Sequence, residues 1–225
     1  MRIKQLHNWQ VSARRAIELQ KQLACRVCCK AIKKNIKYVG GIDCAFTKDS
    51  RKIIACIVLL EYPSLELIEQ AIAVSKVNFP YIPGLLSFRE APVCLEAAAK
   101  LKKLPDVFIV DGQGISHPRR LGLASHIGLF LDKPTIGCAK SRLTGRYDEP
   151  AEDKGSRSEL KDNDEIIGAV LRTRSNVKPV FVSVGHKCLL EQAVHLCLGC
   201  AVKYRLPEPV RLAHQKVSLA KTQIS

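Results

Sequence analysis

The chain has 225 residues, of which 47% are hydrophobic and 25% charged, so it is long enough to bury a substantial core without disulfide or metal staples. Lys and Arg number 36 against 21 Asp and Glu, and the resulting net charge of +15 favours a polyanionic partner such as a nucleic acid. The longest apolar run, residues 53–60, is too short to span a bilayer, and no apolar stretch follows the basic N-terminus, so we expect one cytoplasmic domain over residues 1–225 and no membrane partner.

The first part of the chain is predicted to form a helix and then a sheet of hairpins. Residues 12–30 have the periodicity of an amphipathic helix, with Ser12 as its N-cap. Three strands follow, at about 37–47, 52–62 and 65–77. The turns between these strands are short enough for antiparallel hairpins. Two prolines then stiffen the turn 79–84 and present Tyr81 on a rigid loop.

Strands and helices alternate in the second part of the chain. Pro92 suits the first turn of a helix that continues over 93–103, which places Glu90 at or just before the helix N-terminus. The later elements are expected at 107–110 (strand), 119–131 (helix), 135–139, 166–172 and 179–184 (strands), and from about Pro209 (helix). Residues 146–165 are polar and are expected to be a surface excursion. The pattern predicts an α/β fold, a mixed β-sheet flanked by helices.

Three acidic residues at the edges of apolar or glycine-flanked segments predict a metal site. These residues are Asp43, Glu90 and Asp111. A carboxylate in or at the end of a buried strand is costly to desolvate unless a cation neutralises it, and Mg²⁺ is the leading candidate. Asp111 precedes glycine, where an aspartate is often only a turn residue, whereas Asp43 reads as strand interior. His214 lies on the inward face of the last helix, where histidine is more often a core residue than a ligand.

Ten cysteines are many for a chain of this length. Cys25 and Cys28, and also Cys197 and Cys200, have the spacing of zinc ligands. Both pairs lie in helical patterns, where residues three apart share a face and cysteine serves as a small hydrophobic side chain. About 170 residues separate the pairs, so they form one site only if the two segments touch. Core packing is the simpler interpretation, and a zinc or redox pair is the alternative.

Long motifs of the chain resemble those of the endonuclease V family, DNA repair nucleases that nick near deaminated adenine. The motifs are GID at 41–43, FPYIPGLLSFRE at 79–90, DGQGISHPRRLGLASH at 111–126, PTIGCAKSRL at 134–143 and PEPVRLAH at 207–214. The match extends from about Leu6 to Gln215 and keeps the order of the motifs. The resemblance implies a ribonuclease H-like fold.

The resemblance also implies a catalytic set. Asp43, Glu90, Asp111 and His214 correspond to the metal-site residues, and Lys140 lies beside the scissile phosphate. If His214 is not a direct ligand, it orients the attacking water or relays its proton. The implied cofactor is Mg²⁺, with Mn²⁺ as a substitute. The implied protein is a monomer.

Contacts to DNA are implied by the same motifs. The corresponding residues are Tyr81, Pro83, His117, Arg119 and Arg142. Tyr81 is expected to act as a wedge that fills the gap left by a base removed from the stack. Gly84 and Gly122 are expected to line the lesion pocket, because glycine lets the backbone approach a base closely.

The implied reaction is hydrolysis of the second phosphodiester bond on the 3′ side of deoxyinosine, leaving 3′-hydroxyl and 5′-phosphate ends. An endonuclease specific for inosine-containing RNA is one alternative, which a dependence on the 2′-hydroxyl would reveal. A non-catalytic nucleic-acid-binding protein stapled by zinc on the four paired cysteines is another, which predicts stoichiometric zinc and binding without turnover.

Overall fold

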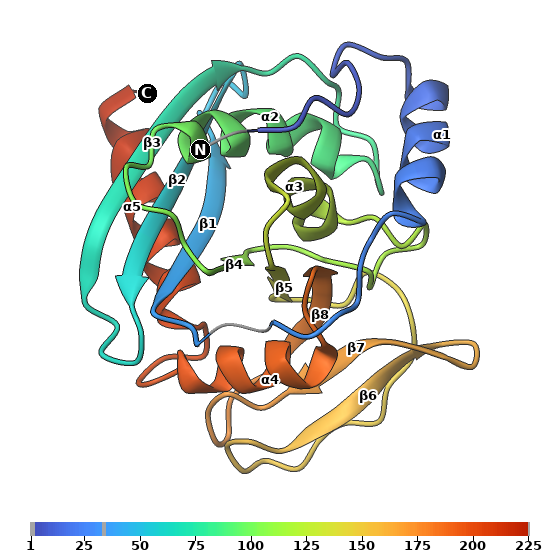
Figure 1. Cartoon of the computed structure of the whole chain (residues 1–225), viewed down its shortest axis with the longest axis vertical. Helices are drawn as coiled ribbons and strands as arrows, with labels where there is room; N and C mark the ends of the chain where they lie inside the picture. Colours follow the sequence, from blue (N-terminus) through green and yellow to red (C-terminus); the bar gives the residue numbers. More distant parts are fainter. Residues whose placement is uncertain (1–2, 33–34, 225) are drawn as a thin grey trace.

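The computed structural model of the chain describes residues 3–32 and 35–224, which form one eight-stranded mixed sheet covered by five helices (Figure 1). The strands are β1 (Tyr38–Phe46), β2 (Lys52–Glu61), β3 (Leu67–Lys76), β4 (Val107–Val110), β5 (Thr135–Ala139), β6 (Arg157–Asp162), β7 (Glu165–Leu171) and β8 (Val180–His186). Their order across the sheet is β3-β2-β1-β4-β5-β8-β7-β6. The central strands β1, β4 and β5 are parallel to one another, and all other neighbours are antiparallel.

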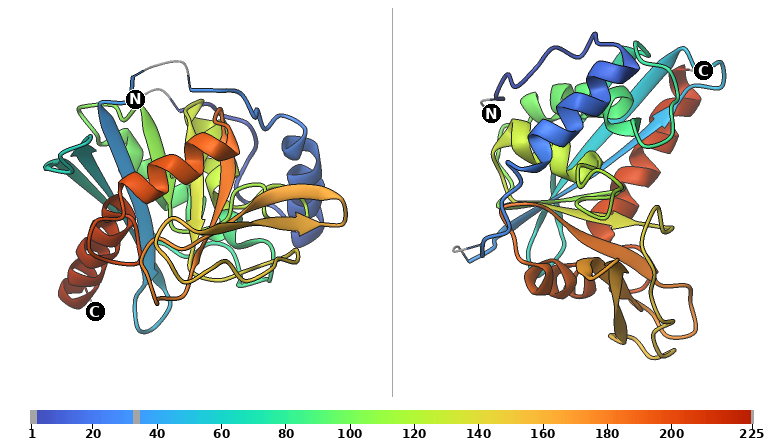
Figure 2. Two further views of the ribbon diagram at one scale, coloured as in Figure 1. Left: turned by 90° about the horizontal axis from the view of Figure 1, so that it is seen from below. Right: turned by 90° about the vertical axis from the view of Figure 1, so that its right-hand side faces the viewer.

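Helices cover both faces of the sheet (Figures 1 and 2). They are α1 (Ala13–Ala24), α2 (Leu86–Ala99), α3 (Leu123–Leu131), α4 (Leu190–Gly199) and α5 (Glu208–Ile224). Helices α2 and α3 pack on one face, and α4 and α5 pack on the other. Helix α1 lies outside the first layer, where Ala16 and Leu19 contact Leu85 and Phe88 at the start of α2. This arrangement confirms the predicted α/β class.

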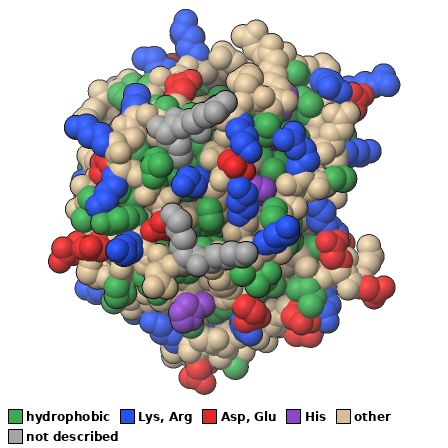
Figure 3. Space-filling model, in the orientation of Figure 1, with side chains coloured by type: hydrophobic (Ala, Val, Ile, Leu, Met, Phe, Trp, Pro, Cys, Tyr) green, Lys and Arg blue, Asp and Glu red, His purple; other side chains and the backbone are tan. Residues whose placement is uncertain are grey.

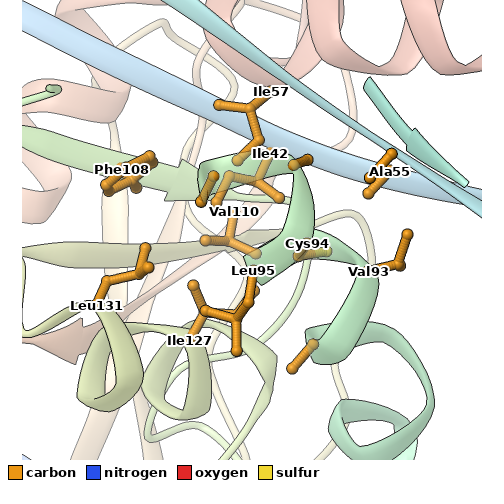
Figure 4. Close-up of a cluster of buried hydrophobic side chains, with 14 of the residues drawn as sticks. Ile42, Ala55, Ile57, Val93, Cys94, Leu95, Phe108, Val110, Ile127 and Leu131 are labelled. Atoms are coloured by element: carbon orange, nitrogen blue, oxygen red, sulfur yellow. The ribbon is translucent and has the colours of Figure 1, made fainter. Parts of the chain in front are cut away.

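The main hydrophobic core lies between the central strands and the helices α2 and α3 (Figure 4). Ile42 of β1, Ile57 of β2 and Val110 of β4 pack there with Leu95 and Ile127. Strand β2 is buried at every position from 53 to 60, because α2 covers one of its faces and α5 the other. The hairpins predicted for β1, β2 and β3 are confirmed. No helix in the described ranges is long and apolar enough to cross a membrane.

The first helix is shorter than the predicted 12–30 and ends at Ala24. Beyond it the backbone bonds to the end of β8. The N–H of Cys28 donates to Nδ1 of His186 at 3.1 Å, and the Cys28 carbonyl accepts from the N–H of Lys187 at 2.6 Å. These long-range bonds replace the helical ones that local periodicity suggested.

Helix α2 starts earlier than predicted, at Leu86, so Pro92 lies inside it and not in its first turn. The missing N–H of proline leaves a helical carbonyl without its usual partner, at a cost of about 3 kcal/mol or more. Burial of Leu85 and Phe88 against α1 fixes the earlier start. Glu90 consequently lies in the body of the helix, buried, and not at its end.

Two other elements differ from the prediction. Helix α3 begins at Leu123 and not near 119, because the N–H of Gly122 donates to the carbonyl of Gly114 at 2.9 Å and closes a turn there. The polar segment 146–165 contains strand β6, which pairs with β7 at the edge of the sheet. Only Leu160 of this strand is buried, so its sequence lacks the alternation of apolar and polar residues that predicts a strand.

Candidate active site

The three parallel strands bring charged side chains to one place. Ile42 pairs with Val110, and the N–H of Asp111 donates to the Ile42 carbonyl at 2.9 Å, so Asp43 within β1 and Asp111 just after β4 lie side by side. Lys140 directly follows β5, the next parallel strand. Open α/β sheets place their ligands at this edge because the strand ends and loops converge there.

Helix α5 adds His214 to the two carboxylates. Nδ1 of His214 lies 2.7 Å from Oδ2 of Asp43. The helix reaches the sheet only because a glycine faces it: a Cβ on Gly41 would lie 2.0 Å from the carbonyl oxygen of Pro209. One potential ligand atom from each of Asp43, Asp111 and His214 lies within 4.8 Å of the others. In the part of the chain that the structure describes, this is the only such group of three or more His, Cys, Asp or Glu side chains.

Burial raises the pKa of two carboxyl groups at this site, those of Asp43 and Glu90. Burial, reinforced by the charge of Asp111, raises the pKa of Asp43 to about 6. Burial also raises the pKa of Glu90 to about 8, although a hydrogen bond from the Cys44 thiol opposes the shift. Asp43 and Glu90 are each only 8% exposed. Glu90 lies outside the compact group of three but close enough for its charge to interact with both aspartates.

The donor set fits a hard divalent cation. Two carboxylates and one imidazole converge, and the mutual repulsion of the aspartates is the unfavourable energy that a bound cation removes. Carboxylate oxygen suits Mg²⁺ and Mn²⁺, and imidazole is a better ligand for Mn²⁺ than for Mg²⁺.

Lys140 forms an ion pair with Asp111 and is held from behind by an arginine. Nη2 of Arg205 donates to the carbonyls of Lys140 and Pro179, at 2.6 and 2.7 Å. Sequence reasoning missed Arg205 because it lies in a loop between α4 and α5 and meets Lys140 only in the folded chain. The guanidinium group of Arg205 therefore supports the backbone of Lys140.

A cavity of about 370 Å³ opens beside Asp111. Its lining includes Tyr81, Pro83, Gly84, Asp111, His117, Gly122, Lys140 and Arg142. The volume is within the usual range of sites for small organic groups. Gly122 is required by close packing, because a Cβ there would lie 2.3 Å from the carbonyl oxygen of Gln113. The structure thus gathers almost all of the predicted contact residues around one hollow.

The loop that carries Tyr81 is held through the carbonyl of Gly84. This oxygen accepts hydrogen bonds from Gln20 at 3.0 Å, from Nε2 of His117 at 3.0 Å and from Nη2 of Arg119 at 2.7 Å. Gly84 has φ +77°, a conformation that favours glycine. Sequence reasoning missed Gln20, which comes from the distant helix α1. His117 and Arg119 face the loop, so their direct contact with DNA stays a prediction.

Tyr81 itself projects from this loop and is 69% exposed. The guanidinium carbon of Arg89 lies 6.0 Å from the Tyr81 ring centre and 4.2 Å from that of Phe46. Arg89 therefore lies between the exposed ring and the sheet, a contact that the sequence did not suggest. Arg142 is exposed at the cavity and donates to the carbonyl of Gly145 at 3.1 Å.

Surface charge does not mark a path for a nucleic acid on the face that Figure 3 shows. On the face shown in Figure 3, Lys and Arg side chains are spread among acidic and apolar ones and do not form one stripe. The cavity and the cluster of Asp43, Asp111 and His214 therefore indicate the place where a nucleic acid binds better than the net charge of +15 does.

Comparison with known proteins agrees with this geometry. The model of the endonuclease V family matches residues 20–215, which include every residue of the cluster and the cavity. The chain belongs to the endonuclease V family. An endonuclease V from Dictyoglomus thermophilum is 53% identical over 198 residues, which cover 88% of this chain and 86% of the relative.

Solved endonuclease V structures share the whole fold. The crystal structure from Streptomyces avermitilis has a TM-score of 0.92 at 38% identity and covers 96% of each chain. The structure from Ciona intestinalis, in complex with a 24-mer DNA containing an inosine followed by a ribo-adenosine, has a TM-score of 0.79 at 29% identity and covers 92% of this chain and 97% of that one. The predicted family and the ribonuclease H-like fold are confirmed.

The paired cysteines do not assemble a four-ligand site in this endonuclease V fold. Cys25 is exposed and caps α1, whereas Cys197, within α4, and Cys200, the C-cap of that helix, are buried in the core. None of the four belongs to a group of three potential metal ligands in the ranges that the structure describes. Cys197 and Cys200 act as small core side chains, as their helical pattern indicated.

The raised pKa of Glu90 predicts that the metal-free protein loses stability as the pH rises from about 6.5 to about 8. The ordinary pKa of a glutamate carboxyl is 4.5, and burial in the fold raises the pKa of Glu90 to about 8. In that window the folded state keeps a proton that the unfolded state has lost, so the free energy of unfolding falls by up to about 1.4 kcal/mol per pH unit. His117 and His186, with pKa values lowered to about 4, act in the opposite direction only below about pH 6.5.

Thermal unfolding in EDTA at the two ends of this window measures the effect. Mg²⁺ should stabilise the protein more at the higher pH, where binding displaces fewer protons. Glu90→Gln should flatten the dependence in EDTA. A melting temperature of the wild-type protein that is constant or rises across the window would contradict the raised pKa.

Proposed function

We propose that this protein is a divalent-metal-dependent endonuclease that hydrolyses the second phosphodiester bond 3′ to deoxyinosine in DNA. The observation that carries the proposal is the junction at Asp111, which belongs both to the acidic cluster and to the lining of the 370 Å³ cavity. The DNA strand that carries a base held in the cavity would therefore pass beside Asp43, Asp111 and His214. The family membership and the inosine-containing DNA bound by the Ciona relative support the same substrate.

The proposed chemistry is an attack of water on phosphorus. The water oxygen forms the new bond to phosphorus, the bond from phosphorus to the 3′ oxygen breaks, and that oxygen takes a proton to give 3′-hydroxyl and 5′-phosphate ends. A divalent cation held by Asp43, Asp111 and His214 would polarise the phosphate and lower the pKa of the attacking water.

Three side chains have further roles in the proposed reaction. Lys140 supplies positive charge beside Asp111, where negative charge builds in the transition state. When His214, whose side chain is 54% exposed, is not itself a ligand of the cation, it orients the water or accepts its proton. Glu90, buried behind the aspartates, adds negative charge when it ionises and so strengthens cation binding at higher pH.

The cavity would select inosine by shape and hydrogen bonding. Hypoxanthine lacks the exocyclic amine of guanine and carries a carbonyl where adenine has an amine. Gly112 and Gly122, which have only backbone to present, line the cavity, and such fixed polar groups reject a base that leaves them unpaired. Tyr81, exposed above the cavity, would fill the gap left in the stack.

A nicking assay tests the function. End-labelled DNA with one deoxyinosine, its undamaged twin and the matching inosine RNA are incubated with the protein in Mg²⁺, in Mn²⁺ or in EDTA, and the cut is mapped. We expect a metal-dependent nick one nucleotide beyond inosine in DNA. Faster cutting of the RNA would favour the RNA endonuclease, and binding without any cutting would favour a non-catalytic protein.

A further inference from the structure

An apolar groove lies beside His214, outside the cavity just described. It has a volume of about 550 Å³ and is lined by Tyr204, Arg211, His214, Gln215, Ser218, Leu219 and Thr222. Tyr204 is 44% exposed and Leu219 is 54% exposed, although both are large apolar side chains. The proposed reaction gives neither of them a role. Both side chains line the same groove as His214, so they lie next to the proposed reaction site.

The groove and the cavity have no lining residue in common, yet each contains one member of the acidic cluster. Asp111 lines the cavity, and His214 lines the groove. The cluster therefore connects the two hollows. A strand that runs from the cavity across the cluster and past His214 would enter the groove.

The aromatic ring in the groove is held in place. The guanidinium carbon of Arg211 lies 4.7 Å from the centre of the Tyr204 ring, and Arg211 is fixed by two hydrogen bonds from Nε and one from Nη2 to the Glu208 carboxylate, at 2.7–3.0 Å. The next residue, Arg205, donates to the carbonyls of Lys140 and Pro179. The ring thus has a fixed position relative to the catalytic lysine, and little entropy is lost when a base stacks on it.

The surroundings of the ring suit an anion with an apolar face. Lys203 places its ammonium group 5.8 Å from the ring centre, and the neighbouring acid, Glu208, is already neutralised by Arg211. Aromatic rings next to cations bind single nucleotides because the base stacks while the phosphate meets the positive charge. An acidic peptide would match the charge but would leave the flat exposed ring without a flat partner.

We propose that this groove binds the nucleotides directly 3′ of the cut, with a base stacked on Tyr204 and packed against Leu219. The direction follows from the proposed function, on which this inference rests: the selected base lies on the Asp111 side, the cut lies 3′ to it, and the groove lies beyond His214. The strand that leaves with the 5′-phosphate is therefore the one held by Tyr204.

Fluorescence of 2-aminopurine tests the stacking without relying on cleavage. The probe is placed at the first or the second nucleotide 3′ of the cut in inosine-containing DNA, and the full-length protein is added with Ca²⁺ in place of Mg²⁺. A base that stacks on an aromatic ring loses fluorescence, so the wild-type protein and Tyr204→Phe should quench one of the two probes. Tyr204→Ala should not. Equal quenching by Tyr204→Ala, or none by the wild type, would overturn the inference.

Affinity measurements on DNA of different length give the second readout. Within each protein, the affinity for DNA extended beyond the cut is divided by that for DNA that ends at the cut. This affinity ratio should fall about 5- to 150-fold in Tyr204→Ala and less in Leu219→Ala. Leu104→Ala, which changes another exposed leucine, should keep the wild-type ratio. An unchanged ratio in Tyr204→Ala contradicts the site. Failure of the wild type to nick deoxyinosine DNA would instead contradict the proposed function, and the quenching would still report on the groove.

Discussion

Replacing Asp43 by asparagine is expected to lower the rate of deoxyinosine cleavage at least about 1,000-fold, because the cluster loses about 4 kcal/mol of cation-dependent stabilisation of the transition state. Asparagine keeps the shape of the side chain and an oxygen that accepts the N–H of Cys44. It removes the charge that a cation requires. Single-turnover cleavage in saturating Mg²⁺, with binding to the same DNA measured alongside, separates the loss of chemistry from a loss of affinity.

The same substitution should leave the metal-free protein as stable as the wild type or more stable. Burial and the charge of Asp111 oppose ionisation of Asp43, and a neutral amide removes that penalty. Asp164→Asn, which removes an exposed carboxylate from the β6–β7 turn, is the matched control and should change neither cleavage nor melting. Wild-type cleavage by the Asp43→Asn protein, or its unfolding at a much lower temperature, would contradict the role given to Asp43.

The site could be predicted from sequence where a carboxylate lies within or directly after an apolar strand. Asp43 and Asp111 stand out because apolar residues surround or precede them, and the parallel register of β1 and β4 then brings them together. The role of His214 could not be predicted from the helix pattern alone, because a core histidine and a ligand both lie on the inward face of a helix. The close approach at Gly41 is what puts it beside Asp43, and local periodicity contains no sign of that approach.

The supporting residues could not be predicted because their partners are distant in the chain. Gln20 meets Gly84 across 64 positions and Arg205 meets Lys140 across 65, and neither contact leaves a local pattern. The early start of α2 has the same origin, because packing against α1 outweighs the proline signal. Strand β6 was missed for a different reason: an edge strand with one buried side chain has too little apolar periodicity to detect.

Replacing Tyr81 by alanine is expected to reduce the preference for deoxyinosine over adenine about 5- to 150-fold, which corresponds to the 1–3 kcal/mol typical of one base stacked on an aromatic ring. The reason is that the wedge compensates for unstacking only when a base has left the helix, so its loss affects the selected complex more than non-specific binding. The measurement is the ratio of kcat/KM for deoxyinosine DNA to that for its undamaged twin, taken with non-specific affinity at several salt concentrations.

A packing role for Tyr81 would give a different result, and the two can be told apart by stability. At 69% exposure the ring buries little surface, so its removal should change the free energy of unfolding by less than about 0.5 kcal/mol. Tyr81→Phe keeps the ring and its contact with Arg89 and should retain the preference. Full preference in Tyr81→Ala would reject the wedge. A large drop in its stability would show instead that the ring holds the loop, whose backbone is already fixed at Gly84 by three hydrogen bonds.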